Sequence, residues 1–526
     1  VNNLAGLEVF SLQFTGNGSS TVSGNAILLD SDITSSQSGT TRISLQTITF
    51  NRGGGTLYAL GTGLLNIESD LVGSGQAEVI LYPFYTNSIG TNLLLQGSIQ
   101  GAVDLVKLGD GVALLTGGSA NTYSGATYVR GGTLYLSKTG VTAVSSKVVI
   151  GDTTAFSQLV DESTGNYPPA LDVTVGGLGE WTLNETAMVT NLMMFLPTGD
   201  GYFGAIINGT GFLSLNCDVT VTNLGNPYYG GGILCTVLLG NQTRAFHISY
   251  NVDQTNFNQN YFNVGIVIGT GSAGIIKDGY GAMTFQKPNS YTGTTLIDQG
   301  ILAVENNGGL PGSQTIIHDT LELDGVTTGE PINFDGGLFG GIAFYESNLL
   351  TGPLTLTTSP NLYSSYSAAF LGLNGVVSVP GALGVGPGIV QLGGTSPNTF
   401  TGGAYVEDYF GDYEVSTLQL AKPGNVIAVP GLIEVTPYGT NILQNLQDNG
   451  LQSVQLDSHS TWLLSGHSVA PQSLSLEGNA TINTQGGQLQ LADAPGTNRF
   501  YVLPNTNIFN PASNFTAQIL GTLACL

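Results

Sequence analysis

The chain has 526 residues, of which 77 are Gly, and its 11 Lys and Arg against 35 Asp and Glu give a net charge of −24. So few cations cannot form the basic surface that a nucleic-acid-binding protein needs. A hydrophobic content of 41% excludes a disordered acidic chain, and the scarcity of Lys excludes a coiled coil. Because Gly, Asn, Thr and Ser separate short apolar runs throughout, the composition favours one long β structure over several packed domains.

The two ends of the chain carry no targeting or capping pattern. No signal-peptide pattern follows Val1, so we expect a processed chain or a piece of a longer one. No apolar run reaches the roughly 18 residues of a membrane-spanning helix, so we expect no membrane span. Neither Val9–Phe14 nor residues 517–526 resemble the polar caps of natural solenoids. We therefore expect the ends to continue into further chain or to contact neighbouring subunits.

One motif occurs three times, within residues 105–138, 274–312 and 385–431. Each copy contains a Gly, an alternating apolar pair, an Asn-x-aromatic-x-Gly segment and a second alternating pair. The motif positions that we predict to be structural are Gly111, Asn121, Tyr123 and Gly125 in the first copy, Gly281, Asn289, Tyr291 and Gly293 in the second, and Gly388, Asn398, Phe400 and Gly402 in the third.

Apolar residues in these copies alternate with a period of two, which predicts short strands with one buried face. Gly and Asn suit the turns between them, and Asn side chains are expected to hydrogen-bond from turn to turn. Such strands bury their inner faces only by stacking. We therefore predict an all-β fold, a right-handed parallel β-helix (β-solenoid) that continues through residues 1–526 as a single elongated rod. Only Ile442, Leu443 and Leu446, within residues 441–446, have a helix-like spacing.

The three copies closely resemble the autotransporter-associated β-strand repeat. The K-x-G-x-G opening of that repeat is present at Lys107–Gly111 and Lys277–Gly281, whereas the third copy lacks the Lys. The resemblance implies a passenger region of a large secreted or surface-attached bacterial protein. Many such proteins look like adhesins or structural surface proteins, so the implied location is secreted or at the bacterial cell surface.

The third copy contains an insertion of seven residues, 407–413, relative to the other two. Insertions in solenoids form loops, often on a functional face. The acidic residues in and beside it are Glu407, Asp408, Asp412 and Glu414. They predict either a Ca²⁺ site or a contact loop, because hard cations bind carboxylate oxygens, or simply a solvated acidic turn. We expect no other cofactor.

Two further features leave alternatives open. Cys217 and Cys235 are 18 residues apart, close to one turn of a solenoid, and could form a disulfide bond or two stacked buried thiols. Tyr-rich segments, such as the one with Tyr363 and Tyr366, could stack on sugars, bind a partner or pack inward.

Signals for catalysis are weak. His459 and His467 lie in a Ser-rich segment near Asp457 without a recognisable catalytic motif, so we predict that the chain is not an enzyme. The interpretation we favour is an extracellular structural protein that assembles with itself, end to end or laterally, into a surface fibre or layer. The alternative is a monomeric adhesin passenger that binds a glycan or a cell surface. A β-helix polysaccharide lyase or hydrolase is the third hypothesis.

Overall fold

The computed structural model describes the chain except for residues 85–89, 152–154, 197–203, 224–230, 250–260, 336–340, 365, 367, 379, 408–413, 425, 438–439, 447–449, 477–479, 484, 486–487, 490–498, 503–507 and 511–526. The described part contains strands β1 to β56 and no helix, in about 19 turns. It divides into two compact units, Val1–Thr270 and Gly271–Leu526. In each unit the strands pair in parallel with the strands of the next turn, which confirms the parallel β-solenoid.

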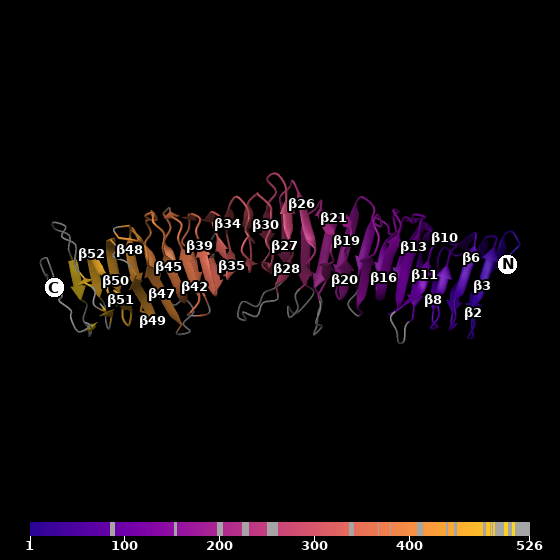
Figure 1. Ribbon diagram of the computed structural model, residues 1–526, viewed down its shortest axis with the longest axis horizontal. Helices are drawn as coiled ribbons and strands as arrows, with labels where there is room; N and C mark the ends of the chain where they lie inside the picture. The colour runs from indigo at the N-terminus through magenta and orange to yellow at the C-terminus, as the bar shows by residue number, and fades with distance from the viewer. Residues whose placement is uncertain are drawn as a thin grey trace. The chain divides into compact units, whose positions relative to one another are not determined.

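Within the first unit, successive turns lie side by side, as the indigo to magenta strands of Figure 1 show. The strands of the first repeat are β13 (Val112–Gly117), β14 (Thr122–Tyr123), β15 (Thr127–Val129) and β16 (Gly132–Lys138). Strand β16 pairs with β13, so that Leu134 lies opposite Ala113 and Leu136 lies opposite Leu115. The second apolar pair of the motif therefore lies one turn above the first pair, and the motif spans one turn of the solenoid.

The core of the first unit consists of columns of inward-facing apolar residues, one per turn. One column is Leu65, Leu93, Ala113, Leu134, Leu159, Trp181, Ile207 and Ile233, each at most 1% exposed. Burying one such side chain contributes about 1.5–3 kcal/mol. Because each residue of a column contacts its neighbours above and below, no turn buries its inner face alone.

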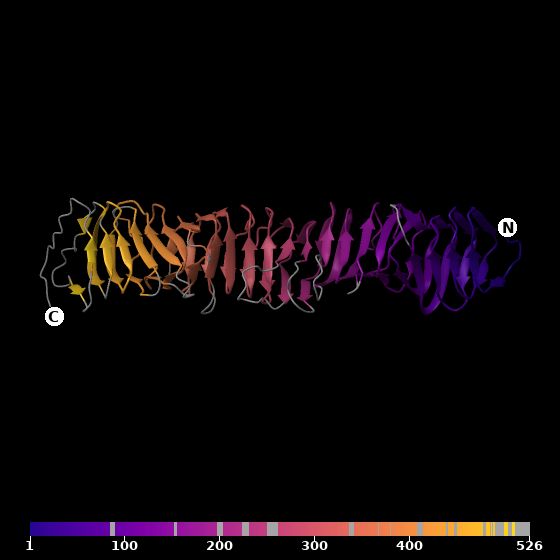
Figure 2. The ribbon, with the colours of Figure 1, turned by 90° about the horizontal axis from the view of Figure 1, so that it is seen from below.

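The second unit repeats this arrangement (Figure 2, rose to yellow) and adds a further parallel sheet. The strands of this sheet used below are β39 (Ser347–Leu350), β42 (Phe370–Leu373), β45 (Gly388–Leu392), β47 (Val415–Leu420), β49 (Thr440–Asn445), β51 (Thr461–Leu463) and β53 (Thr481–Asn483).

The helix-like interpretation of residues 441–446 was wrong, because most of this segment belongs to strand β49. Leu443 is buried in the core, whereas Ile442 is partly exposed on the outer face. Pairing with β47 on one side and β51 on the other fixes the alternation of a strand. Periodicity alone cannot assign so short an apolar run to a helix or a strand, and the pairing with neighbouring strands decides for the strand.

The other two motif copies follow the first. Leu302 lies opposite Met283 in the second copy, and Leu418 lies opposite Val390 in the third. Six of the seven inserted residues, 408–413, lie outside the described residues, so that the positions of Asp408 and Asp412 are not described.

Candidate functional surfaces

The motif Asn residues join three successive turns. Asn121 accepts a hydrogen bond from the amide N of Ile99 (2.9 Å) and donates one to the carbonyl O of Ala143 (2.6 Å), so it binds the turns before and after its own. The third copy repeats both bonds, since Asn398 accepts from the amide N of Val377 (2.9 Å) and donates to the carbonyl O of Ala428 (2.8 Å). In the second copy, Asn289 donates to the carbonyl O of Gly309 (2.8 Å).

These bonds are the turn-to-turn hydrogen bonds expected of the motif Asn, and all of them are buried. A buried backbone group needs a partner, and the corner of a turn has left the strand ladder. The Asn side chain supplies that partner where the ladder is interrupted.

The motif aromatic residues are also structural. Tyr123 is 4% exposed and its hydroxyl lies 2.5 Å from the hydroxyl of Thr127, and the second copy repeats this contact between Tyr291 and Thr295 at 2.7 Å. In the third copy the aromatic residue is Phe400, and the residue four positions later is Ala404, so both hydroxyls are missing together. At these two motif positions the hydroxyls are therefore present together or absent together, which is consistent with the cost of an unpaired buried hydroxyl.

Four of the Lys residues, Lys107, Lys138, Lys277 and Lys422, are fully buried. The ammonium Nζ of Lys107 donates to the carbonyl O atoms of Leu108 (3.0 Å), Gly109 (2.7 Å) and Gly131 (2.6 Å). Lys277 makes the same set of three bonds in the second copy. Burial lowers the pKa of Lys107 and of Lys277 to about 7, while the carbonyl acceptors favour the charged form. These ammonium groups cap turn carbonyls inside the solenoid.

The buried position of these Lys residues was not predicted from the sequence, although the sequence contains a signal for it. Lys138 follows Leu134 and Leu136 at the same period of two, so the strand alternation directs it inward. Its Nζ donates to the carbonyl O of Thr116 (3.0 Å) and to that of Ser119 (2.9 Å).

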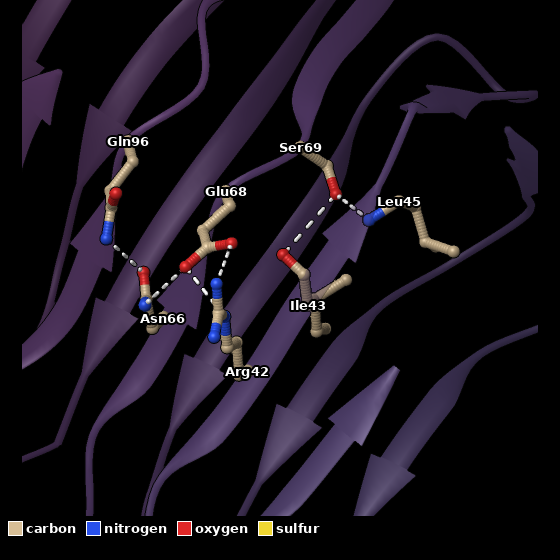
Figure 3. A network of polar contacts seen from close by, with 7 residues as sticks. All are labelled: Arg42, Ile43, Leu45, Asn66, Glu68, Ser69 and Gln96. Atoms are coloured by element: carbon tan, nitrogen blue, oxygen red, sulfur yellow. Dashed lines mark hydrogen bonds and ion pairs between the residues drawn. The ribbon is translucent and has the colours of Figure 1, made fainter. Parts of the chain in front are cut away.

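Polar side chains on the outer surface also join neighbouring turns (Figure 3). The guanidinium of Arg42 contacts both carboxylate oxygens of Glu68, at 2.7 and 2.9 Å, and this holds the pKa of the carboxyl below its usual range. Asn66 donates to Glu68 (3.3 Å), and Gln96 donates to Asn66 (3.1 Å). Exposed ion pairs contribute roughly 0–1 kcal/mol, so the network orders the surface more than it stabilises the fold.

Two acidic residues are buried in the described part of the chain with a raised pKa. Burial raises the pKa of Asp161 to about 6, although its carboxylate accepts hydrogen bonds from the amide N of Asn184 (2.9 Å) and of Glu185 (2.7 Å). Burial likewise raises the pKa of Glu330 to about 7, and Thr315 donates to its Oε1 (3.0 Å). Asp161 is 1% exposed and Glu330 is 7% exposed, so both carboxyl groups are shielded from solvent.

Aromatic side chains gather on the outer face of the first unit, where β8 (Gly55–Ala59) pairs with β10 (Asp70–Pro83). Tyr58 and Tyr82 lie opposite each other, with ring centroids 5.5 Å apart and an interplanar angle of 55°. Leu60 and Phe84 directly follow the paired strands and are 42% and 45% exposed. We call these four residues the aromatic patch.

The second unit has a smaller aromatic contact. Tyr366 is 63% exposed and lies edge-on against Tyr345, with ring centroids 5.8 Å apart. Of the two Tyr residues singled out from the sequence, Tyr366 is therefore at the surface, whereas Tyr363 is only partly exposed.

The two Cys residues singled out from the sequence are free thiols and form no disulfide bond. Cys217 follows β23 (Phe212–Leu215), whereas Cys235 precedes β26 (Thr236–Gly240), and these strands pair in parallel. The two thiols therefore lie toward opposite ends of a strand pair. The 18-residue separation suggested a neighbouring position because the turn was assumed to be shorter than the 24 residues from Phe212 to Thr236.

Of the four acidic residues proposed for Ca²⁺, only Glu407 and Glu414 are among the described residues. The described part of the chain contains no group of three His, Cys, Asp or Glu side chains that could hold a metal ion. None of its segments forms a helix long and apolar enough to cross a membrane.

Comparison with known proteins identifies the repeat. The family described as Passenger-associated-transport-repeat matches residues 105–136 and 275–304, which contain the first two motif copies. The Adhesin BmaC autotransporter of Brucella suis biovar 1 (strain 1330) is 25% identical over 507 residues. That alignment covers 83% of this chain and 14% of the adhesin, so the chain spans a small part of its relative's length. No solved structure matches the chain.

The motif residues, the turn-by-turn pairing and the relative agree with one another. The chain carries passenger-associated transport repeats on a parallel β-solenoid, is distantly similar to an autotransporter adhesin, and has the secreted or surface-exposed location of an autotransporter passenger.

Proposed function

We propose that the chain is an adhesive passenger segment that binds a neutral glycan through the aromatic patch of its first unit. The similarity to an autotransporter adhesin favours adhesion over a fibre or layer subunit as the main role. Because the chain spans only 14% of that relative, the argument for adhesion depends on a surface of this chain itself.

The aromatic patch continues into a column of polar side chains along the same face. Thr34 lies opposite Tyr58 on the preceding turn, and Gln13 lies opposite Thr34 on the turn before that. An exposed ring offers a flat apolar face to a sugar, while hydroxyl and amide groups offer hydrogen bonds. Apolar surface combined with a few placed polar groups is the usual composition of a small-ligand site. This column is the observation on which the proposal depends.

The negative charge of the chain favours neutral over acidic glycans as ligands. A net charge of −24 repels sialylated or sulfated sugars over distances of about one Debye length, roughly 8–10 Å at physiological salt. The patch itself consists of Tyr58, Leu60, Tyr82 and Phe84, none of which is charged at neutral pH. We therefore expect neutral hexose or N-acetylhexosamine glycans to bind in preference to acidic ones.

Catalysis is not part of the proposal. A glycosidase needs two carboxyl groups on either side of the bond that it breaks, and the patch contributes none. We infer that the chain binds sugar without changing it.

The test is a glycan array probed with the purified chain, followed by titration of the best neutral glycan. Tyr82→Ala should weaken binding by about 2–10-fold, because one ring contact contributes about 0.5–1.5 kcal/mol. Tyr280→Ala, which removes a 68% exposed ring of the second unit, is the matched control and should leave binding unchanged. Binding of acidic glycans alone, or an equal loss in both variants, would contradict the proposal.

A further inference from the structure

Seven neighbouring strands of the second unit, β39, β42, β45, β47, β49, β51 and β53, form an outer face without a charged side chain. Each strand contributes two positions that point away from the core and align in two columns along the stacked turns; of these positions Gly372 and Thr417 are themselves buried. The first column is Ser347, Phe370, Ile389, Thr417, Ile442, Thr461 and Thr481, and the second is Leu349, Gly372, Gln391, Gln419, Gln444, Leu463 and Asn483. We call these two columns the neutral face.

The neutral face differs from the neighbouring sheets of the same unit. One of those sheets carries outward Asp278, Asp298 and Asp335, and another carries Glu322 and Glu434. At the rim of the neutral face, Glu346 is exposed next to Ser347. The columns themselves contain neither an acidic nor a basic residue over seven turns, although the whole chain carries a net charge of −24.

Hydrogen bonds between turns hold the second column in order. Gln391 donates to the side-chain carbonyl of Gln419 (3.0 Å), and Gln419 donates in the same way to Gln444 (3.0 Å). Gln444 donates in turn to the hydroxyl of Ser465 (3.1 Å). Such amide ladders and the β-branched residues beside them are typical of sheet faces that pack dry against an identical face. The ladder also fixes three long side chains before any partner binds, which lowers the entropy cost of association.

We infer that the neutral face binds a second copy of this chain, face to face, as the same surface on both partners. Two chains of charge −24 repel each other through any acidic face, so the face without charge is where the repulsion at contact is smallest. A contact between identical surfaces forms a closed two-fold dimer. The inference is independent of glycan binding, because the aromatic patch belongs to the first unit.

The size of the neutral face predicts the strength of this contact. Seven strands about 4.8 Å apart extend over about 29 Å, and the strands, which have three to six residues, are on average about 15 Å long. One copy therefore contributes about 430 Å², and a dimer buries about 870 Å² in total, which is below the roughly 1,000 Å² of a stable interface and within the range of weak, transient contacts. The dimer should thus be weak, so that it forms at high chain concentration and where many chains are held close together on a surface.

The test is sedimentation of the purified full chain from micromolar to millimolar concentration in moderate salt. The wild-type chain should dimerise as its concentration rises. Gln419→Glu adds a negative charge to the centre of the face, while its carboxylate still accepts the hydrogen bond from Gln391, and should raise the dissociation constant at least tenfold. High salt should partly restore the dimer, since it screens the added repulsion.

Two control variants distinguish the effect of the added charge on dimerisation from the effect of interrupting the hydrogen-bond ladder. Gln419→Thr interrupts the ladder but keeps the face neutral, so dimerisation should be largely retained. Gln242→Glu makes the same chemical change at an exposed residue of the first unit, outside the aromatic patch and its polar column, and should leave dimerisation unchanged. A wild-type chain that stays monomeric at every concentration would overturn the inference, as would an equal loss of dimer in Gln419→Glu and Gln242→Glu. If all three variants dimerised as strongly as the wild-type chain, the dimer would form through another surface, and the inference would be wrong.

Discussion

Replacing Asn121 with Ala removes both hydrogen bonds that join the first motif turn to its neighbours. The amide N of Ile99 and the carbonyl O of Ala143 would then be buried without a partner. Each such group costs about 1–3 kcal/mol, so we expect Asn121→Ala to destabilise the three turns by about 2–5 kcal/mol.

Because a solenoid can open locally, the assay should follow single turns rather than global melting. Hydrogen exchange of the Ile99 amide reports directly on the bond to the side chain of Asn121. A loss of 1.4 kcal/mol or more in local stability predicts exchange at least about tenfold faster in Asn121→Ala. Thr122→Ala, which changes an exposed side chain next to Asn121, is the matched control and should leave this exchange unchanged.

Unchanged exchange at Ile99 in Asn121→Ala would refute the reasoning. It would mean that water or a shifted backbone replaces the amide, and that the motif Asn does not join the turns. Faster exchange throughout the second unit as well would equally contradict the local nature of the effect.

Three further predictions concern a buried pair of hydroxyls, a buried carboxyl group and two thiols. Tyr123→Phe and Thr127→Ala should each lower the free energy of unfolding by about 1 kcal/mol. The double variant should lose less than the sum, because the two hydroxyls bond each other. A double-mutant cycle of melting curves checks this, and full additivity would contradict it. The pKa of Glu330 in the folded chain is raised to about 7 from the ordinary 4.5. Between these pH values the folded chain holds a proton on Glu330 that the unfolded chain has lost. The free energy of unfolding should therefore fall by roughly 3 kcal/mol from pH 4.5 to pH 8. Chemical denaturation at both pH values should show this slope, and Glu330→Gln should flatten it; an unchanged slope in the variant would rule Glu330 out. Cys217 and Cys235 should both alkylate after denaturation without reductant, and mass spectrometry that finds them linked would contradict their positions toward opposite strand ends.

The fold could be predicted because the motif contains both the strand period and the length of a turn. A period of two specifies strands, and the spacing from Ala113 to Leu134 is the length of one turn. The joint loss of hydroxyls at Phe400 and Ala404 could also have been read from the sequence, since both positions lie within the motif.

Other features depend on which residues become neighbours, and these could not be predicted. The distance between Cys217 and Cys235 depends on a turn length that the motif does not cover. The neutral face requires the register of seven strands, of which only parts of β45 and β47 match the motif. For Ile442, the apolar run fits a helix as well as a strand, and pairing with β47 decides between them.

The most direct test of the proposed adhesion is binding of the fluorescently labelled chain to intact glycan-bearing cells. We predict saturable binding by the wild-type chain, competed by the neutral glycan found on the array, and a loss of roughly 5–150-fold when Tyr58 and Tyr82 are both replaced with Ala. Saturable binding that is unaffected by the glycan and equal in the double variant would contradict the account, and would indicate that another surface carries the adhesion.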